Sequence, residues 1–527
     1  MYQPAYPTSA LSRDDRLVWS DSNLLAECDI HSIDRNLSAT AAAPRRRSAV
    51  VFSGGSGFSP FVDMLQVRPS RSLLDLVVNV PFLQGLTNRV SYVMPVSDDG
   101  GSTSEIVRVL GGPGIGDIRS RLLGLVDRDN SARKLLSYRL PTSDASVATM
   151  EWMQLVAENH PLWIHVPIQV RPIIRSFLLH FFEKSLSQLS LDTPAFDFRG
   201  ACVGNLFLTG ARIFFGSLEA AIHTFTSVIG YMGHAKVIPI IATSSTRVGI
   251  AATLEDGTCI YGQCEISHPS SQEPLEQNDG IARTVLQRDS KTSIKTLVSD
   301  TPGLPRRKSN LFFNKSESCT SLPSRIHRVF YTDGGKREVA PVLNPLVETQ
   351  LRTTGTILYA MGSLYTSLIP CLVVPGTGQL VAESRARKIL LLNGTWDRET
   401  EGYTAEDFVQ AIVDALELSM DAGVCSPPTS VPGGVTTQPE LGFLESPLPS
   451  PGERMGESRL SRHPPRLFIT HVLYTEDSRV PIDEDALQNI GITCIPVRAH
   501  GTVTGNFSES VGYYGAEELK EVLEMLL

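Results

Sequence analysis

Short apolar runs that end in glycine-rich turns recur along this sequence. Residues 49–52 form the first such run, which closes at Gly54 and Gly55. Residues 90–96 form the second, and an acidic glycine turn and a helix-like stretch at residues 104–110 follow it. Buried parallel strands have continuous apolar runs, and helices join them along the chain. The pattern therefore predicts an α/β fold, a Rossmann-like, doubly wound and mostly parallel sheet with helices on both faces.

Further elements follow from the same pattern. The apolar and aromatic stretch at residues 143–195 predicts a buried helix or helical pair inserted into the core, and residues 206–231 predict one helix. Residues 255–257 lie between two apolar runs and predict a hairpin turn. A closing helix is expected at residues 516–526, and additional strands are expected at residues 237–242, 249–254, 356–359, 389–392, 467–469 and 492–495.

Composition divides the 527 residues into core segments and segments of low complexity. Residues 1–46 lack sustained periodicity and predict a loosely ordered extension. Residues 269–323 are rich in Ser, Thr, Lys, Arg and Pro, and residues 425–465 are rich in Pro, so both predict disordered insertions. The core is therefore assigned to residues 47–268, 324–424 and 466–527.

Charge and apolar content limit the partners that we expect. The formal net charge is −9, so the chain has no overall basic field and nonspecific nucleic-acid binding is not expected. No apolar stretch reaches membrane-spanning length, and Asp14 and Asp15 interrupt any signal-like run, so no membrane partner is expected. We expect a cytoplasmic protein with a small-molecule ligand, and leave open whether it is a homo-oligomer.

The first candidate site is the turn Gly54, Gly55, Ser56 and Gly57, directly after the first strand. Glycines have no Cβ, so backbone N–H groups in such a turn can approach a phosphate closely. Glycines at a turn between a strand and a helix also occur for geometry alone, and both explanations stay open. The turn lacks the GK[ST] ending of a P-loop, which disfavours an NTP hydrolase.

The second candidate site is the acidic turn after the second strand. It contains Asp98, Asp99, Gly100, Gly101 and Ser102. Adjacent carboxylates can bind a divalent metal such as Mg²⁺ or Mn²⁺, orient a hydroxyl group, or act as a base, so both acids are candidate catalytic and metal-binding residues. The alternative is capping of the following helix, which needs no ligand.

Polar groups also follow the later strands. Asp117 and Arg119 end a turn with four glycines, Asn205 begins a predicted helix, and Asn393 follows an apolar run. Ligands of such folds bind beyond the carboxyl ends of the strands, so these residues are candidate ligand contacts. The remaining candidates are Gly362, Ser363, Tyr365, Thr366, Ser367 and Tyr403.

Several motifs in a fixed order resemble the CofD and YvcK family. They are GGSG at residues 54–57, DDGGS at 98–102, GDIR at 116–119, Tyr138-Arg139, GNL at 204–206, GSLYTS at 362–367 and ETEGYTAEDF at 399–408. The resemblance implies a Rossmann-like fold and a phosphorylated ligand in the crevice. CofD proteins transfer a phospholactyl group from a guanosine diphosphate carrier to a deazaflavin alcohol with a divalent metal. YvcK proteins bind nucleotide sugars and act in regulation, and the DDGGS and GDIR motifs favour that branch.

This sequence departs from the family pattern at two places. Residues 200–202 are Gly-Ala-Cys where family members usually have GHS, and residues 360–363 are Ala-Met-Gly-Ser where they have GPGS. We therefore expect phosphate binding to persist with a different substrate preference. The leading hypothesis is a nucleotide-binding, metal-dependent transferase of a phospho group, resembling 2-phospho-L-lactate transferase. The alternative is a noncatalytic regulatory protein that binds a nucleotide sugar.

Overall fold

A computed structural model describes residues 48–54, 62, 87, 89–190, 194–242, 247–268, 321–334, 337–421, 462–499 and 512–527. All of them lie in one compact unit, Arg46–Leu527. The predictions for residues 1–46, for most of the two insertions, and for Gly55, Ser56 and Gly57 lie outside the described residues.

Seven parallel strands form the main sheet of the described chain, in the order β11-β10-β9-β8-β1-β2-β3. Val51 of β1 lies beside Tyr92 of β2 on one side and Leu358 of β8 on the other. These three side chains are fully buried, as the continuous apolar runs predict. The strands are β1 Ser48–Phe52, β2 Arg89–Met94, β3 Lys236–Pro239, β8 Thr356–Tyr359, β9 Arg387–Leu391, β10 His471–Thr475 and β11 Thr493–Val497. The sheet confirms the predicted fold class.

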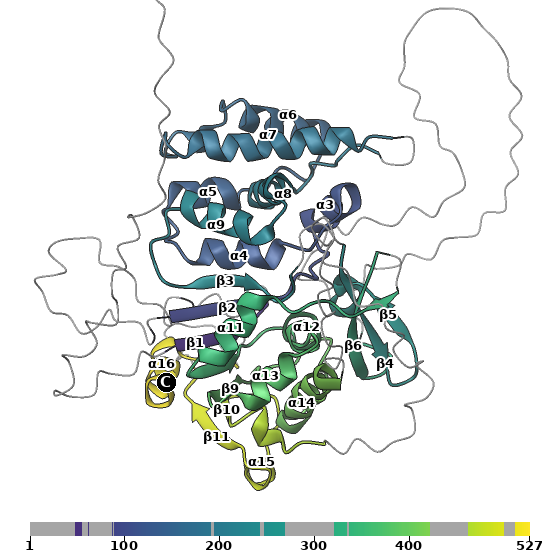
Figure 1. Ribbon diagram of the computed structural model, residues 1–527, viewed down its shortest axis with the longest axis vertical. Coiled ribbons are helices and arrows are strands. Elements are labelled where there is room, and N and C mark those ends of the chain that lie inside the picture. Colours follow the sequence, from purple (N-terminus) through teal and green to yellow (C-terminus); the bar gives the residue numbers. More distant parts are fainter. Residues whose placement is uncertain are drawn as a thin grey trace, which may run out of the picture. The chain divides into compact units, whose positions relative to one another are not determined.

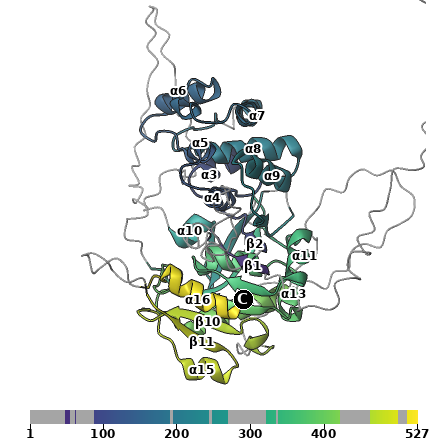
Figure 2. The ribbon, with the colours of Figure 1, turned by 90° about the vertical axis from the view of Figure 1, so that its left-hand side faces the viewer.

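The order of the strands reverses beside β1. The chain proceeds from β1 through β2 to β3 in one direction, then returns to place β8 on the other side of β1 and continues to β11. In doubly wound sheets, the crevice at such a reversal is where ligands bind. Figure 1 shows the sheet with its helices, and Figure 2 brings α16 forward, beside β10 and β11.

The helices and single turns match much of the predicted pattern. The predicted closing helix has the bounds of α16 Ala516–Leu526. The others before β8 are α3 Ser102–Leu110, α4 Gly116–Gly124, α5 Ser131–Ser137, α6 Ala145–Val156, α7 Arg171–Ser187, α8 Val203–Phe215, α9 Leu218–Val228, α10 Gln263–Ser267 and α11 Pro345–Thr353. After β8 come the π-helix η4 Leu364–Leu368, α12 Ile369–Leu372, α13 Thr377–Glu383, α14 Ala405–Asp421 and α15 Glu484–Asn489.

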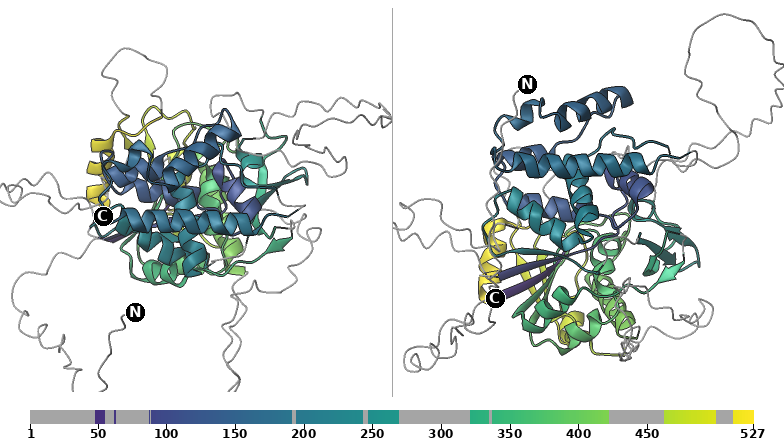
Figure 3. Two further views of the ribbon diagram at one scale, coloured as in Figure 1. Left: turned by 90° about the horizontal axis from the view of Figure 1, so that it is seen from above. Right: turned by 45° about the horizontal axis from the view of Figure 1, so that its top comes forward.

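The predicted helical stretch at residues 143–195 contains α6 and α7, and Figure 3 shows these helices outside the layer that contains α8 and α9. Helix α7 packs so closely on α8 that a Cβ on Gly210 would lie 2.0 Å from the Phe177 carbonyl oxygen. The prediction of a single helix at residues 206–231 is wrong, because two helices, α8 and α9, occupy this range. Gly216 adopts a left-handed conformation that ends α8, and the Ser217 side chain caps α9 by accepting from the Ala220 N–H group.

A second sheet has four antiparallel strands in the order β5-β4-β6-β7. Its strands are β4 Gly249–Leu254, β5 Cys259–Tyr261, β6 Ile326–Thr332 and β7 Glu338–Val339. The turn between β4 and β5 confirms the predicted hairpin, with Gly257 at a φ of 86°. The sequence did not predict this sheet as a separate layer.

The strand predicted at residues 467–469 is also wrong. Pro464 and Pro465 lead into a single 3₁₀ turn, Pro465–Leu467, because proline fixes φ and lacks an N–H donor, and β10 starts only at His471. Before that turn, the Arg462 guanidinium pairs with Asp421 at 2.9 Å. Residues 462–465, which the prediction placed in the second insertion, therefore contact α14.

Among the described residues, no single helix has both the length and the apolar composition to cross a membrane. One pair, Leu364–Leu372 and Thr377–Glu383, meets that test only when its two members are counted together, and the pair is bent by 77°.

Candidate functional site

Asp98 and Asp99 lie just beyond the carboxyl end of β2, next to the start of α3. The Thr103 hydroxyl donates to Asp98 Oδ2 at 2.8 Å, and the Gly100 N–H group donates to Asp98 Oδ1 at 3.2 Å. The Cys264 N–H group, in the first turn of α10, donates to Asp99 Oδ1 at 2.9 Å. Gly101 is the N-cap of α3, and no side chain caps that helix. Simple helix capping therefore does not describe the role of Asp98.

Burial raises the pKa of both carboxyl groups. For Asp98, the hydrogen bonds from Thr103 and Gly100 and the charges of Arg119 and Arg139 oppose this shift. For Asp99, the Cys264 N–H group opposes it, and the charge of Asp98 adds to it. Two adjacent buried acids favour an added cation, because a cation would reduce their mutual repulsion.

The glycines at residues 112–116 allow close contacts around Asp98. A Cβ on Gly114 would lie 2.2 Å from the Asp98 carbonyl oxygen, and a Cβ on Gly116 would lie 2.1 Å from Asp98 Oδ2. Gly112 packs against the buried Arg212 guanidinium, where a Cβ would come within 2.6 Å of Cζ. The high glycine content of this turn is thus required by packing against Asp98 and Arg212.

Ser102 and Asn205 meet between α3 and α8. The Asn205 Nδ2 group donates to Ser102 Oγ at 3.0 Å and lies 3.5 Å from Thr103 Oγ1. Both residues are 2% exposed. Within the described part of the chain, the buried Asn205 Oδ1 atom has no hydrogen-bond donor. It can therefore accept from a ligand hydroxyl or amino group.

Three helices begin near this cluster without a capping side chain. They are α3, α4 and α8, whose N-caps are Gly101, Ile115 and Cys202. The Arg119 side chain packs against Gly204 at the start of α8, where a Cβ would lie 3.1 Å from its Cγ and Cδ atoms. Helix starts and arginines both favour anions, so this side of the crevice suits a phosphate.

Gly54 and Ser367 bring the ends of β1 and β8 together. A Cβ on Gly54 would lie 2.3 Å from the Ser367 Cβ atom. Ser367 belongs to η4, in which the Ser367 and Leu368 N–H groups both donate to the Ser363 carbonyl oxygen, at 3.1 and 3.3 Å. A π-helical turn is rare and often marks a functional site.

Gly362 and Asn393 join the ends of β8 and β9. The Gly362 N–H group donates to Asn393 Oδ1 at 3.2 Å, and Asn393 Nδ2 donates back to the Gly362 carbonyl oxygen at 2.8 Å. Both ends of the Asn393 amide therefore bind backbone, and the residue shapes the crevice from within the protein.

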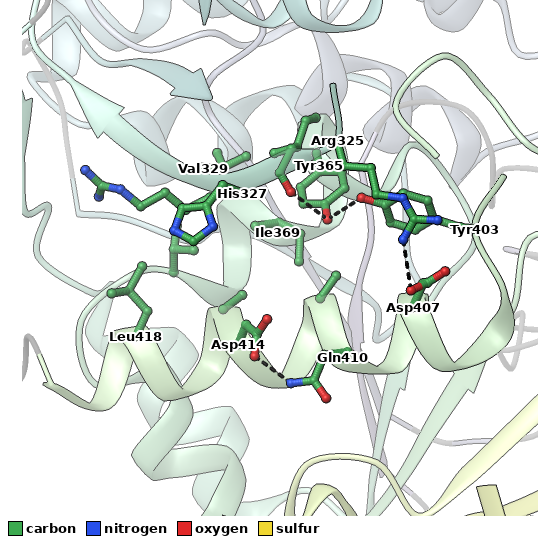
Figure 4. A pocket seen from close by; sticks show the side chains of 15 residues that line it. Arg325, His327, Val329, Tyr365, Ile369, Tyr403, Asp407, Gln410, Asp414 and Leu418 are labelled. Atoms are coloured by element: carbon green, nitrogen blue, oxygen red, sulfur yellow. Dashed lines mark hydrogen bonds and ion pairs between the residues drawn. The ribbon is translucent and has the colours of Figure 1, made fainter. Parts of the chain in front are cut away.

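Tyr365 and Tyr403 lie on a different side of η4. Their hydroxyl groups are 3.0 Å apart, and Figure 4 shows them pointing toward one another in a pocket of about 80 Å³ between β6 and α14. Arg325 stacks over the Tyr403 ring at 4.7 Å and pairs with Asp407 at 3.1 Å. The residues that line this pocket include neither acid of the β2 turn. The two tyrosines are thus not brought together with Asp98.

Arg121 was not predicted from the sequence. It is fully buried, and its Nη2 group donates to Ser53 Oγ at 3.2 Å at the end of β1. Burial lowers the pKa of this guanidinium, and the charges of Tyr92 and Asp117 oppose the shift. Helix α4 thus carries Gly116 beside Asp98 and Arg121 beside Ser53, and it connects the two halves of the crevice.

Two charged residues near these contacts, Arg139 and Glu399, lie within the family motifs. Arg139 donates to the Gly200 carbonyl oxygen at 3.2 Å and lies near the start of α3, where a Cβ on Gly101 would be 3.8 Å from Arg139 Nη1. Glu399 is buried and binds backbone N–H groups of η4. Charged residues within the motifs Tyr138-Arg139 and ETEGYT were the signal that could have identified them.

Comparisons with known proteins agree with the fold and with these motifs. The family model described as 2-phospho-L-lactate transferase CofD matches residues 49–434. This chain belongs to the CofD family. An uncharacterized protein of Saccharomyces cerevisiae, YNL011C, is 30% identical over 91% of this CofD-family chain and 99% of its own length.

Bacterial relatives carry a different description. The gluconeogenesis factor of Halalkalibacterium halodurans is 23% identical over 70% of this chain and 74% of its own length. The gluconeogenesis factor of Bacillus subtilis is 23% identical over 69% of this chain and 73% of its own length. The crystal structure of protein BH3568 from Bacillus halodurans shares the fold, with a TM-score of 0.50 and 18% identity over 91% of this chain and 99% of that one.

Proposed function

We propose that this CofD-family chain binds a phosphorylated, nucleotide-type ligand in the crevice at the carboxyl ends of β8, β1 and β2. The observation that carries the proposal is the position of two helix starts without a capping side chain, those of α3 and α4, beside Asp98 and close to the reversal of strand order at β1. Unpaired N–H groups at helix starts bind phosphate oxygens, and doubly wound sheets bind ligands at the reversal.

The roles of individual residues follow from their positions. Gly54 would approach the phosphates through its backbone N–H group, and Gly55, Ser56 and Gly57 lie outside the described residues. Arg119 would add positive charge to the helix starts. The Asn205 Oδ1 atom, which is buried and lacks a donor among the described residues, would accept from a sugar hydroxyl or a base amino group.

The paired acids fit a divalent cation that is shared with the ligand. Within the described ranges, no group of three or more His, Cys, Asp or Glu side chains is arranged to hold a metal. Mg²⁺ commonly uses only one or two carboxylates together with phosphate oxygens, and each carboxylate can accept more bonds than those already made here. Asp98 and Asp99 would thus hold Mg²⁺ or Mn²⁺, which would neutralise charge on the phosphate oxygens.

A second candidate function is transfer of a phospho group from the bound nucleotide to a hydroxyl acceptor. The adjacent carboxyl groups favour it, because one can bind metal while the other orients or deprotonates the acceptor. The description of the family model agrees with such chemistry. The bacterial relatives are named gluconeogenesis factors, a name that includes no transferase activity, and we keep a noncatalytic regulatory protein as the alternative.

A ligand screen separates these functions. The full chain would be tested by thermal shift and calorimetry with nucleoside diphosphates and nucleotide sugars in Mg²⁺, and each binding mixture would be analysed for product with hydroxyl acceptors. Binding without product supports the regulatory function, and a product that carries the phospho group supports the transferase. The proposal is wrong if no nucleotide in the panel binds.

A further inference from the structure

Glu399 is a buried carboxyl group that has no part in the proposed ligand contacts. It is 3% exposed and lies after β9, in the segment that leads into α14. Its Oε2 atom accepts from the N–H groups of Tyr365 at 2.9 Å and Thr366 at 3.1 Å. Its Oε1 atom accepts from the Thr366 hydroxyl at 2.5 Å. One side chain therefore binds three donors in the first turn of η4.

The segment around Glu399 is itself held in place. Asp397 Oδ1 accepts from the Glu399 N–H group at 3.0 Å and from the Thr400 hydroxyl at 2.7 Å, which fixes the turn that presents the carboxyl group. The side chain of Arg398 points to the other wall of the crevice. Its Nη1 group donates to the Glu265 carbonyl oxygen in α10 at 2.8 Å.

These contacts link the two sides of the proposed ligand site. Helix α10 binds Asp99 through the Cys264 N–H group, and Arg398 binds the same helix. Glu399, the next residue, binds Thr366, which directly precedes Ser367. Ser367 is the residue that packs on Gly54 at the end of β1.

We propose that Glu399 is a positioning residue for this site, which holds the first turn of η4 so that Ser367 and Gly54 form the phosphate-binding wall of the crevice. The inference rests on the proposed function, since the wall has a purpose only if a phosphate binds there. Glu399 itself would touch no ligand and would act through Thr366 and Ser367.

The electrostatics of Glu399 agree with this role. Burial raises the pKa of Glu399 to about 8, the charge of Asp397 adds to the shift, and the hydrogen bonds from Thr366 and Tyr365 oppose it. A buried ionisable group is unfavourable for stability unless its hydrogen bonds compensate. A group perturbed in this way beside a ligand crevice is more typical of a functional site than of a core position.

The test compares Glu399→Ala and Glu399→Gln with Glu401→Gln, a change at a neighbouring exposed carboxylate that accepts from the Ser321 hydroxyl. Each full-length variant would be titrated with GDP, UDP and the matching nucleosides in Mg²⁺. Hydrogen exchange would be followed in peptides that cover residues 362–368. Glutamine can still accept from the two N–H groups, so it should rescue most of the loss.

We expect Glu399→Ala to weaken diphosphate binding about tenfold and to leave nucleoside binding unchanged, with about tenfold faster exchange at residues 362–368. Glu399→Gln should stay within about threefold of the wild type, and Glu401→Gln should match it. If Glu399 has only a structural role, Glu399→Ala should weaken diphosphate and nucleoside binding equally, and that result would overturn the proposal. Unchanged hydrogen exchange at residues 362–368 in Glu399→Ala would also overturn it.

One further variant and one further comparison cover the cases in which the first test gives no result. If Glu399→Ala does not fold, Thr366→Val removes only the hydroxyl contact and should shift both readouts in the same direction, by less; no shift would overturn the proposal. If the wild type binds no nucleotide, the proposed function fails, and the exchange comparison alone still decides whether Glu399 positions η4.

Discussion

Gly54 and Ser367 are packed so closely that a Cβ on Gly54 would lie 2.3 Å from the Cβ atom of Ser367. The two residues follow β1 and β8, which are neighbours at the place where the order of the strands reverses. Glycine is therefore required at residue 54 by the approach of Ser367, apart from any need for a special φ. This contact closes one side of the crevice in which we propose that a phosphate binds.

The contact predicts a rescue experiment. Gly54→Ala should lower the free energy of unfolding by about 1–3 kcal/mol, because the added methyl group overpacks a tight contact. Ser367→Gly in the same chain removes the opposing Cβ and should recover most of the loss. Urea unfolding of the two single variants and the double variant measures the coupling. Additive effects in the double variant would show that the residues do not meet in solution.

Two glycines of α4 provide a second, matched comparison. A Cβ on Gly116 would lie 2.1 Å from Asp98 Oδ2, whereas a Cβ on Gly124 would meet nothing within 4 Å. We expect Gly124→Ala to stabilise the protein by about 0.4–1 kcal/mol, because alanine restricts the unfolded chain. Gly116→Ala should destabilise it by about 1–3 kcal/mol and weaken ligand binding. Equal stabilities in thermal unfolding would contradict the packing of Gly116 on Asp98.

The pKa of Glu399 predicts a pH dependence of stability. Burial raises it from the usual 4.5 to about 8, so the folded state holds the proton more tightly than the unfolded state does. The stability that this group contributes is complete below about pH 4.5 and is lost as pH rises through 8. Between pH 4.5 and pH 8, the one-proton titration of Glu399 lowers the free energy of unfolding by up to about 1.4 kcal/mol for each unit by which the pH rises.

Glu399→Gln should remove that one-proton slope, and the exposed control Glu401→Gln should keep it. The raised pKa values of Asp98 and Asp99 add to the slope in the same direction and remain in both variants. Urea unfolding at pH 5, 6, 7 and 8 measures the difference. If the free energy of unfolding changes with pH in the same way in the wild type and in Glu399→Gln, the titrating group is not Glu399.

The paired acids predict a metal dependence of ligand binding. If Asp98 and Asp99 share a cation with the ligand, a nucleoside diphosphate at about 100 times its Kd should stabilise the wild type by roughly 2.7 kcal/mol in Mg²⁺ and by much less in EDTA. Asp98→Asn and Asp99→Asn should bind equally in both solutions, since the asparagine oxygen can still accept one hydrogen bond from the backbone but the charge is lost. Asp129→Asn, a change at an exposed acid, serves as the control. An equal thermal shift of the wild type in Mg²⁺ and in EDTA would exclude the metal role.

The sequence predicted the elements whose signals are local. The strand at residues 356–359 and the closing helix at residues 516–526 match β8 and α16 residue for residue, because apolar periodicity and flanking turns define their ends. The break between α8 and α9 also had a local signal, since Gly216 and Ser217 are a typical helix end and helix cap. Apolar residues continue on both sides of this break, so periodicity alone predicted one helix.

Other features depend on tertiary contacts that a single sequence does not contain. Arginine is a residue type that is usually exposed, yet Arg121 is fully buried and donates to the Ser53 hydroxyl. The acids after β2 were predicted as a site, but their contact with α10 of the second sheet was not. Asn393 stays a predicted ligand contact, and the two hydrogen bonds that join its amide to Gly362 were not predicted. In each case the partner lies far away along the chain.

Calorimetric titration of the wild type with GDP and UDP, each compared with its nucleoside in the same Mg²⁺ buffer, tests the central claim most directly. If the helix starts beside Asp98 and the turn at Gly54 hold phosphates, at least one diphosphate should bind about 100-fold more tightly than its nucleoside, a difference of about 2.8 kcal/mol. Equal affinities for diphosphate and nucleoside, or no binding of either diphosphate, would contradict the claim that this crevice is a phosphate site.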